Sequence, residues 1–331
     1  MSNLFIIGNG FDIAHDLPTS YEDFHQYLIR KYPNAPNMRQ SFNIKKIKMP
    51  DGTKEFNKDE VVAFLIDRIS SMEKNGNNWC DIETSLGRLD YENYINELAY
   101  LSDKEIKALI RDEFEDGDFF MRGDGYDMLE HISNNLLEAT IIIQELFSEW
   151  VNTIDISSTF PMNSFANLLN PSKDTFLTFN YTTVLEEIYG AEDVQHLHGI
   201  QNGEIIFGHG EEEKDGFSTF TFTTPPLLLL HSILKKDTES ILSDHLYPFL
   251  DNLVENFFEN SFEDDVFIEK IYTYGFSFSK VDLPYIKGIC LSIDTSNVTW
   301  YLHTFHNDEE RKRFKGIIEE CGFKGRFDTF S

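Results

Sequence analysis

Four short apolar segments each end in polar or small residues of the kinds that bind ligands or take part in catalysis. The segments and the residues that follow them are Leu4–Ile7 before Gly8-Asn9-Gly10-Phe11-Asp12, Thr175–Phe179 before Asn180, Val194–Leu197 before His198, and Ile271–Tyr274 before Gly275-Phe276-Ser277. Each pattern is typical of a buried strand followed by a loop. In an open parallel sheet, ligands bind beyond the carboxyl ends of the strands, so the four segments predict one shared site.

The first of these loops has the composition of a phosphate-binding loop. Backbone N–H groups at Gly8 and Gly10 can approach a diphosphate, and a helix N-terminus behind them adds about 0.3–1 kcal/mol. The full dinucleotide motif needs a third glycine where Ile13 stands and an acidic residue at the end of a second strand. A standard dehydrogenase is therefore disfavoured. Asp12 is predicted either to bind a ribose or substrate hydroxyl or to support a tight turn.

Asn180 and His198 are the main catalytic candidates. The amide of Asn180, at the rim of the sheet, is predicted to hold a water molecule or a ribose hydroxyl, with turn formation as the alternative. Histidine titrates near neutral pH, so His198, at a strand end beside Gly199, is predicted to be the general base. His209 follows another predicted strand and competes for this role. His196 is expected to be a core or supporting histidine.

Two further interpretations concern a metal ion and a nucleophile. A metal site built from His196, His198 and His209 is a less favoured interpretation than a catalytic role for one of these histidines. Ser277 is predicted to contact a phosphate or a ribose as the chain leaves its strand. It is disfavoured as a hydrolase nucleophile, because the flanking residues do not form the G-x-S-x-G pattern.

Strand and helix patterns alternate in the second half of the chain, which predicts an α/β fold with a mainly parallel, Rossmann-like sheet flanked by helices. Residues 1–35 and 165–331 are predicted to form this nucleotide-binding domain. Between about Lys58 and Trp150 apolar side chains recur at helical spacing, and residues 36–164 are predicted to form a large, mostly helical insertion. In residues 210–263 the apolar side chains show neither helical nor strand spacing, and this segment is predicted to be a variable lid or interface. Further strands are expected at 205–207 and 298–302, and helices at 183–189, 280–292 and 308–321.

The charge of the chain limits its partners. The 331 residues include 57 acidic and 28 basic ones, and the formal net charge of −29 opposes binding to nucleic-acid phosphates. The net charge does not exclude a small phosphorylated ligand, which a local basic pocket can bind. Cys80, Cys290 and Cys321 are widely separated, so neither a disulfide framework nor a cysteine-rich zinc site is predicted. No segment has the pattern of a signal peptide or reaches membrane-spanning length, so we expect a cytoplasmic protein with no membrane partner.

Taken together, the motifs resemble the bacterial AbiH family, which is associated with abortive infection by bacteriophage. The segment from Ile6 to His15 carries most of the resemblance, together with Leu17-Pro18-Thr19-Ser20-Tyr21. Support comes from Phe179-Asn180-Tyr181-Thr182, Leu197-His198-Gly199 and Tyr274-Gly275-Phe276-Ser277. The resemblance implies an anti-phage protein, for which a phage-derived trigger and a homo-oligomer are open partner predictions.

More distantly, the same order of motifs is similar to sirtuin-like NAD-binding proteins. That resemblance implies that NAD is the substrate, that Asn180 orients water or the ribose, and that His198 is the catalytic histidine. The residues carried over as nucleotide contacts are Gly8, Asn9, Gly10, Phe11, Asp12, Pro18, Tyr181, Gly199, Gly275, Phe276 and Ser277. Asn9 and Asp12 stand where many sirtuin-like loops have smaller residues. The chain lacks the four paired cysteines of the deacylase zinc module, so no zinc is expected and protein deacylation is disfavoured.

The predicted reaction is therefore cleavage of the nicotinamide–ribose bond, which depletes NAD and arrests the infected cell. A different class of function is a non-catalytic nucleotide sensor that controls a partner or an oligomer through the insertion or residues 210–263. A third is a metal-dependent nuclease using Asp12, His198 and His209, which the acidic charge disfavours.

Overall fold

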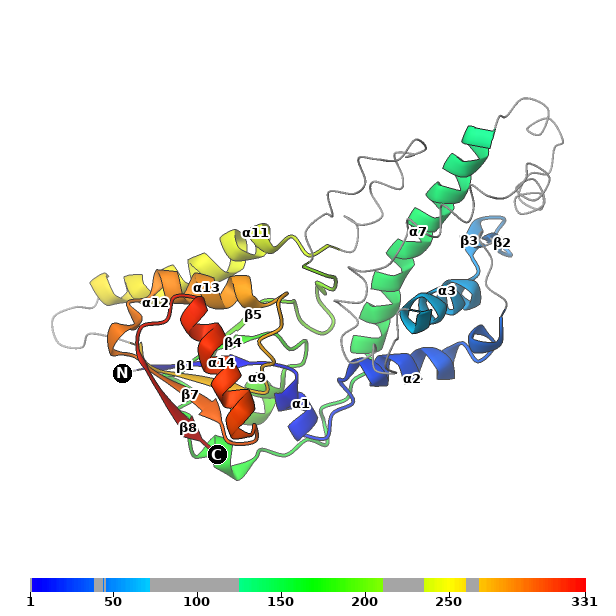
Figure 1. Ribbon diagram of the computed structural model, residues 1–331. Coiled ribbons are helices and arrows are strands. Elements are labelled where there is room, and N and C mark those ends of the chain that lie inside the picture. The colour runs from blue at the N-terminus through cyan, green and yellow to red at the C-terminus, as the bar shows by residue number, and fades with distance from the viewer. Residues whose placement is uncertain (1, 39–43, 45, 72–124, 211–234, 260–267) are drawn as a thin grey trace. The chain divides into compact units, whose positions relative to one another are not determined.

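A computed structural model describes residues 2–38, 44, 46–71, 125–210, 235–259 and 268–331 (Figure 1). The chain forms two compact units. Unit 1 consists of residues 1–20, 151–206 and 237–331, and unit 2 consists of residues 21–150 and 207–236. The sequence placed the first two boundaries at residues 35 and 164, whereas the structure divides the chain at residues 20 and 150.

Unit 1 is built on a six-stranded sheet with the order β5-β4-β1-β6-β7-β8, and every pair of neighbours is parallel. The strands are β1 (Ser2–Ile7), β4 (Thr175–Thr178), β5 (Asp193–His196), β6 (Ile268–Tyr274), β7 (Thr299–His303) and β8 (Arg326–Phe330). The predicted α/β fold with a parallel sheet is thus confirmed. The chain runs outward from β1 through β4 to β5 and then returns to β6 on the other side of β1. In doubly wound sheets, the crevice for ligands lies at such a reversal.

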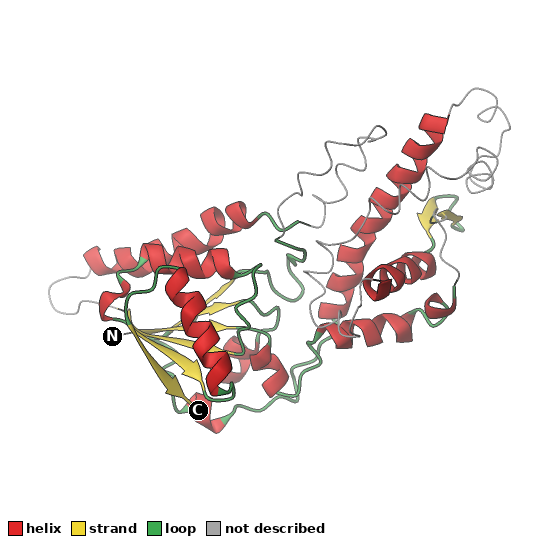
Figure 2. Cartoon of the chain, viewed as in Figure 1, coloured by secondary structure: helices red, strands yellow, loops and turns green. Residues whose placement is uncertain are grey.

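One face of this sheet is covered by helices from the second half of the chain (Figure 2). They are α11 (Thr238–Ile241), the π-helical turn η6 (Leu242–Leu246), α12 (Tyr247–Glu259), α13 (Leu283–Ser292) and α14 (Asp308–Glu320). Leu4 and Ile6 of β1 and Trp300 of β7 are fully buried in one core cluster with residues of these helices.

The segment 210–263 was predicted to be a variable lid or interface, and for residues 237–259 this prediction is wrong. Here Ile241, Leu246 and Leu250 are buried in the core of unit 1, because their spacing places them on one side of consecutive helical turns. Residues 211–234 and 260–263 of the predicted lid lie outside the described residues.

The opposite face of the sheet carries a row of stacked aromatic rings across four strands. Phe5 of β1 stacks on Phe176 of β4 and on Tyr272 of β6, with ring centroids 5.1 and 4.9 Å apart. Tyr272 in turn stacks on Tyr301 of β7 at 4.6 Å. Phe165 of the short helix α8 (Asn163–Ala166) packs edge-on against Phe5. Such pairs contribute about 0.5–1.5 kcal/mol each beyond the area they bury, so they help to hold the strands in register.

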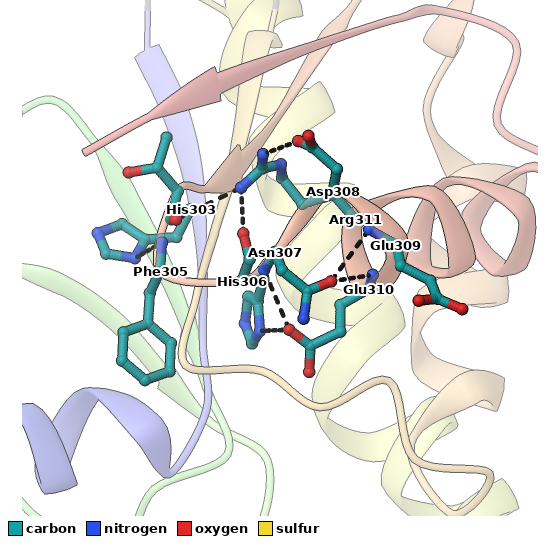
Figure 3. Close-up of polar contacts among 9 residues, drawn as sticks. His303, Phe305, His306, Asn307, Asp308, Glu309, Glu310 and Arg311 are labelled. Carbon is teal, nitrogen blue, oxygen red and sulfur yellow. Dashed lines mark hydrogen bonds and ion pairs between the residues drawn. The ribbon is translucent and has the colours of Figure 1, made fainter.

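Helix α14 begins with the hydrogen-bonded turn drawn in Figure 3. The Asn307 side chain accepts hydrogen bonds from the N–H groups of Glu309 and Glu310, both at 3.0 Å. The N–H group of Asn307 donates to the Glu310 carboxylate at 3.1 Å. This capping box satisfies N–H groups that the first helical turn leaves unpaired. It fixes the start of a helix that buries Phe314 and Ile318 against the core.

The described part of unit 2 is mostly helical, and residues 72–124 of the predicted insertion lie outside the described residues. Its elements are α2 (Tyr21–Lys31), the 3-10 turn η1 (Ala35–Asn37), the hairpin β2 (Lys46–Lys48) and β3 (Lys54–Phe56), α3 (Lys58–Ser71) and α7 (Gly125–Val151). Phe24 of α2 packs against Phe147 and Trp150 of α7, with both centroid distances at 5.3 Å. Phe207 stacks on Phe147 at 3.9 Å. These contacts place α2, and the chain from residue 207, in unit 2 instead of the sheet domain.

The remaining predicted elements agree with the structure to within a few residues. The helix predicted at 183–189 is α9 (Val184–Tyr189), and those at 280–292 and 308–321 are α13 and α14. Residues 205–207 form no strand, and Ile205 makes only an isolated bridge with Gly199. The edge strand β8 was not predicted. Within the described residues, no helix combines the length and the apolar character needed to cross a membrane.

Candidate functional site

The four predicted motifs lie at the ends of neighbouring strands, at one edge of the sheet. Ile7, the last residue of β1, pairs with Thr178 at the end of β4 and with Tyr274 at the end of β6. Thr178 pairs with His196, the last residue of β5. The loops that follow these strands therefore start side by side, although they are far apart in the sequence. The predicted convergence of the four strand ends is confirmed.

The glycine loop has a different role from the one expected. The N–H of Gly8 donates to the carbonyl of Tyr274 at 3.0 Å, and the N–H of Gly10 donates to the carbonyl of Gly275 at 2.9 Å. The prediction that these two N–H groups hold a diphosphate is therefore wrong for this conformation. A Cβ atom on Gly8 would lie 2.6 Å from the Gly275 oxygen, so the glycines allow the loop to approach β6 closely. From Gly10 the chain forms the short helix α1 (Gly10–Ala14).

Several predicted contact residues of the same loops support the fold. Phe11 is fully buried and packs against Phe165, and Phe276 is 3% exposed and packs against Phe179. Their side chains are core residues, which corrects their assignment as ligand contacts. The amide of Asn9 donates to the carbonyl of Thr19 at 2.8 Å and ties the loop to the chain before α2.

Asp12 is the buried carboxyl group at this edge, with 1% of the residue exposed. Its Oδ2 atom accepts a hydrogen bond from the Thr182 hydroxyl at 2.7 Å, while its Oδ1 atom has no hydrogen-bond partner among the described residues. Burial raises the pKa of Asp12 to about 7, although Thr182, Asn180 and His196 each act to lower it. This carboxyl can therefore gain or lose a proton near neutral pH, which is a common property of functional sites.

Asn180 follows β4 directly and is 4% exposed. Its N–H donates to the Thr178 hydroxyl at 3.1 Å, and its carbonyl accepts from Nδ1 of His196 at 3.0 Å. In the described part of the chain, neither the oxygen nor the nitrogen of its side-chain amide has a hydrogen-bond partner. The amide acts to lower the pKa of Asp12, which places it close to that carboxyl. Leaving a buried polar group unpaired costs about 1–3 kcal/mol, so this amide is a strong candidate for a ligand contact.

His196 supports Asn180 from the neighbouring strand. Its Nδ1 faces the Asn180 carbonyl, and its Nε2 lies 2.7 Å from a carboxylate oxygen of Glu186 in α9. Both neighbours are hydrogen-bond acceptors, so both ring nitrogens of His196 are engaged by groups of the protein. Because both nitrogens are occupied, His196 acts as a supporting histidine and is not arranged as a metal ligand.

His198 lies just beyond β5, and its partner is a carboxylate from a distant segment. Nε2 of His198 is 3.8 Å from Oδ1 of Asp282, the residue that precedes α13. The rings of Phe179 and Tyr285 surround the imidazole edge-on at 5.2 and 5.9 Å. Gly199 has a φ of +83° and its Cβ would lie 1.9 Å from the Glu204 oxygen, so only glycine fits this sharp turn after His198.

Asp282, Thr182 and Glu186 belong to the cluster without a sequence signal that assigns them to it. Asp282 stands before a predicted helix, where a negative charge is favourable without any functional role. Thr182 stands at the start of another predicted helix, where threonine commonly serves as a cap. Glu186 gave no signal, because nothing in the sequence pairs an α9 residue with His196.

Of the other predicted residues, Tyr181 lies beside this cluster: its ring centroid is 6.4 Å from that of His198, and its hydroxyl donates to the Ile206 carbonyl at 3.1 Å. Ser277 and Pro18 are exposed. His209 is fully buried within unit 2, where it forms a bridge with Lys235, so the strand end predicted before it is absent. Among the residues that the structure describes, no group of three or more His, Cys, Asp or Glu side chains is arranged to hold a metal ion.

The two main candidates are covered in this conformation, since Asn180 is 4% and His198 is 5% exposed. The strand ends therefore converge on side chains that are buried in this conformation.

Comparison with known proteins identifies the family. A family model described as "Bacteriophage abortive infection AbiH" matches residues 4–304, which include all four strand-end motifs and most of both units. Searches of curated proteins and of solved structures gave no match, so the similarity to sirtuin-like proteins stays a prediction. The resemblance to the AbiH family is confirmed over nearly the whole chain. The protein therefore belongs to the AbiH family of bacteriophage abortive infection proteins.

Proposed function

We propose that this protein stops phage infection by hydrolysing NAD at the bond between nicotinamide and ribose. The observation that carries the proposal is the cluster at the ends of β1, β4 and β5. It combines the unpartnered amide of Asn180, the buried carboxyl of Asp12 and the imidazole of His198. These groups lie beside the reversal of strand order, where doubly wound sheets bind their ligands.

The chemistry needs few groups. When the bond between C1′ and the nicotinamide nitrogen breaks, its electron pair goes to the ring nitrogen and C1′ becomes an oxocarbenium-like centre. Water then attacks C1′ and loses one proton. Asn180 is proposed to orient the ribose or this water, and His198, steadied by Asp282, to accept a proton from ribose or water. Ser277, exposed at the end of β6, is proposed to contact the ribose or the diphosphate.

The burial of the cluster bears on regulation of this activity. Because Asn180 and His198 are covered, the form described here is proposed to be the resting form of the enzyme. The apparent affinity for NAD then falls in proportion to the fraction of molecules in the open form. A phage-derived trigger that binds the open form better would raise that fraction and start NAD cleavage.

The test is to incubate the purified protein with NAD, alone and with a lysate of infected cells, and to measure nicotinamide and ADP-ribose by chromatography. His198→Ala and Asn180→Ala should lower turnover strongly, since general-base assistance contributes about 10²–10⁴-fold. The matched controls are His245→Ala and Asn297→Ala, which change exposed residues of the same unit. An inert wild type in every condition, or full turnover by both site variants, would refute the proposal.

The same burial favours one alternative from another class, a nucleotide sensor without turnover. A covered site holds a ligand firmly but releases products slowly, which suits a switch. This alternative predicts heat of binding on titration with NAD, no nicotinamide release, and a change in oligomeric mass when NAD is added. Calorimetry and light scattering on the same sample distinguish it from the enzyme.

A further inference from the structure

We infer that Asp12 is a further catalytic residue of the proposed NAD cleavage, the group that takes the proton of the attacking water. The inference rests on the proposed function and assigns to Asp12 a step beyond contact with the ligand. Two residues then accept protons at the site. Asp12 accepts the proton of water, and His198, beside Asp282, accepts a proton from a ribose hydroxyl group.

The geometry of the carboxyl group is the first support. The hydrogen bond from Thr182 fixes Oδ2, at 2.7 Å, and thereby sets the direction of Oδ1. Oδ1 is buried, and neither this atom nor the polar atoms of the Asn180 amide have a hydrogen-bond partner within 3.5 Å among the described residues, while the amide lies close enough to Asp12 to lower its pKa. An amide that orients a water molecule beside a free carboxyl oxygen is the pair of groups that general-base hydrolysis requires.

Burial is the largest effect on the pKa of Asp12 and raises it, and groups from three other segments act on it as well. The Asn180 amide after β4 and His196 of β5 lower the pKa, whereas Glu186 of α9 raises it. His15, which follows the helix that carries Asp12, lies between the Phe11 carbonyl and the Tyr189 hydroxyl, and burial lowers its pKa. The opposing effects leave a carboxyl that works as a base near neutral pH.

The proposed step breaks one bond at C1′, forms another and moves one proton to Asp12. The C1′–N bond breaks and its electron pair neutralises the positive charge of the pyridinium ring, which leaves as nicotinamide. The oxygen of water forms a bond to C1′, and one proton of that water passes to Oδ1 of Asp12. The carboxylic acid then returns the proton to solvent. While it is ionised, Asp12 also stabilises the positive charge that develops on the ribose.

The experiment measures kcat and KM for NAD hydrolysis from about pH 5.5 to 9, in the condition, with or without infected-cell lysate, in which the wild type is active. Asp12→Asn keeps the shape of the side chain and removes the base. We expect it to lower kcat by about 10²–10⁴-fold while KM changes by only a few fold. Wild-type kcat should fall as the pH drops below about 7, because the protonated carboxyl cannot accept a proton. In Asp12→Asn the fall with its midpoint near pH 7 should disappear, whereas His198→Ala should retain it.

Thr182→Val is a second test of the inference, and it does not depend on the Asp12→Asn variant. It removes the hydrogen bond that lowers the pKa of Asp12, so the acidic fall in kcat should move to higher pH. A purely structural role of Asp12 would not produce this displacement. The matched control is Asp155→Asn, an exposed carboxyl in the same unit, which should leave kcat and its pH profile unchanged.

Two results would overturn the inference while leaving the proposed function intact. One is an active Asp12→Asn enzyme with kcat within about threefold of the wild type. The other is an unchanged acidic fall in Thr182→Val, and this result decides the question even when Asp12→Asn does not fold. A wild type that releases no nicotinamide in any condition overturns the inference and the proposed function together.

Discussion

The buried carboxyl of Asp12 makes a specific prediction about stability. In the unfolded chain this group has its ordinary pKa of 3.8, and burial raises the pKa to about 7 in the folded protein. Between these values the folded state keeps a proton that the unfolded state has lost. The free energy of unfolding therefore falls as the pH rises through this window. At about 1.36 kcal/mol per pKa unit, a rise of about three units costs the folded state about 4 kcal/mol above pH 7.

Asp12→Asn removes this cost, because the amide cannot ionise. The Thr182 hydroxyl can still donate to the amide oxygen, and the Asn180 amide lies close to this side chain. We expect the difference in unfolding free energy between the variant and the wild type to be smallest near pH 4. It should then increase in favour of the variant by about 4 kcal/mol by pH 8. A residue that costs stability but serves catalysis is a common trade-off.

The assay is urea unfolding between pH 4 and 8, followed by the fluorescence of Trp300. Trp300 is fully buried in the core of unit 1, so it reports on the unit that contains Asp12. Replacing Trp79 and Trp150 by Phe in both proteins leaves it as the sole tryptophan. A difference that stays constant across the pH range, or a variant that loses stability relative to wild type as the pH rises, would refute the reasoning.

The control for this experiment has the opposite sign. Asp294 is an exposed carboxyl in unit 1 that accepts a hydrogen bond from the Ser296 N–H at 3.1 Å, and hydrogen bonding lowers its pKa. Its contribution to stability is present above its ordinary pKa and is lost as the pH falls through the lowered value. Asp294→Asn should therefore lose stability relative to wild type as the pH rises, the reverse of Asp12→Asn.

Two further predictions concern the loops and helices that position the site. Gly275→Ala should destabilise unit 1 by more than about 2 kcal/mol, because Gly275 has a φ of +64° and its Cβ would lie 2.2 Å from the Phe11 nitrogen. Gly316→Ala is its matched control, since no described atom lies within 4 Å of its Cβ; it should stabilise α14 by about 0.5–1 kcal/mol. Asn307→Ala removes the capping box of α14 and should cost about 0.5–2 kcal/mol, whereas Asn297→Ala should change stability little. Urea unfolding of each variant at pH 7 measures all four effects, and an unchanged midpoint for Gly275→Ala or Asn307→Ala would contradict the assignment.

The sequence was most informative about the strands that end at the site. An apolar run followed by a polar or glycine residue marks where a parallel strand leaves the core, so Asn180, His198 and Gly275 were placed correctly at one edge. The α/β fold followed from the alternation of strand and helix patterns. Both are local signals, which need no knowledge of distant contacts.

Features that depend on packing between distant segments were missed. The N–H groups of Gly8 and Gly10 cannot bind a ligand while they donate to the carbonyls of Tyr274 and Gly275. These carbonyls lie at the end of β6, far away in the sequence, so no local pattern predicts the two bonds. Helix α2 follows the glycine loop in sequence but belongs to unit 2, because Phe24 packs on α7. The pairing of His198 with Asp282 likewise joins two segments that no local pattern connects.

The central claim is that the ends of β1, β4, β5 and β6 form one nucleotide site. A structure of the protein crystallised with NAD, or with a non-hydrolysable analogue of it, tests this claim most directly. The account predicts that the nicotinamide riboside half lies beside Asn180 and His198, with Oδ1 of Asp12 within hydrogen-bond distance of a water or of the ribose. A dinucleotide bound elsewhere, with Asn180 and His198 still covered, would contradict it.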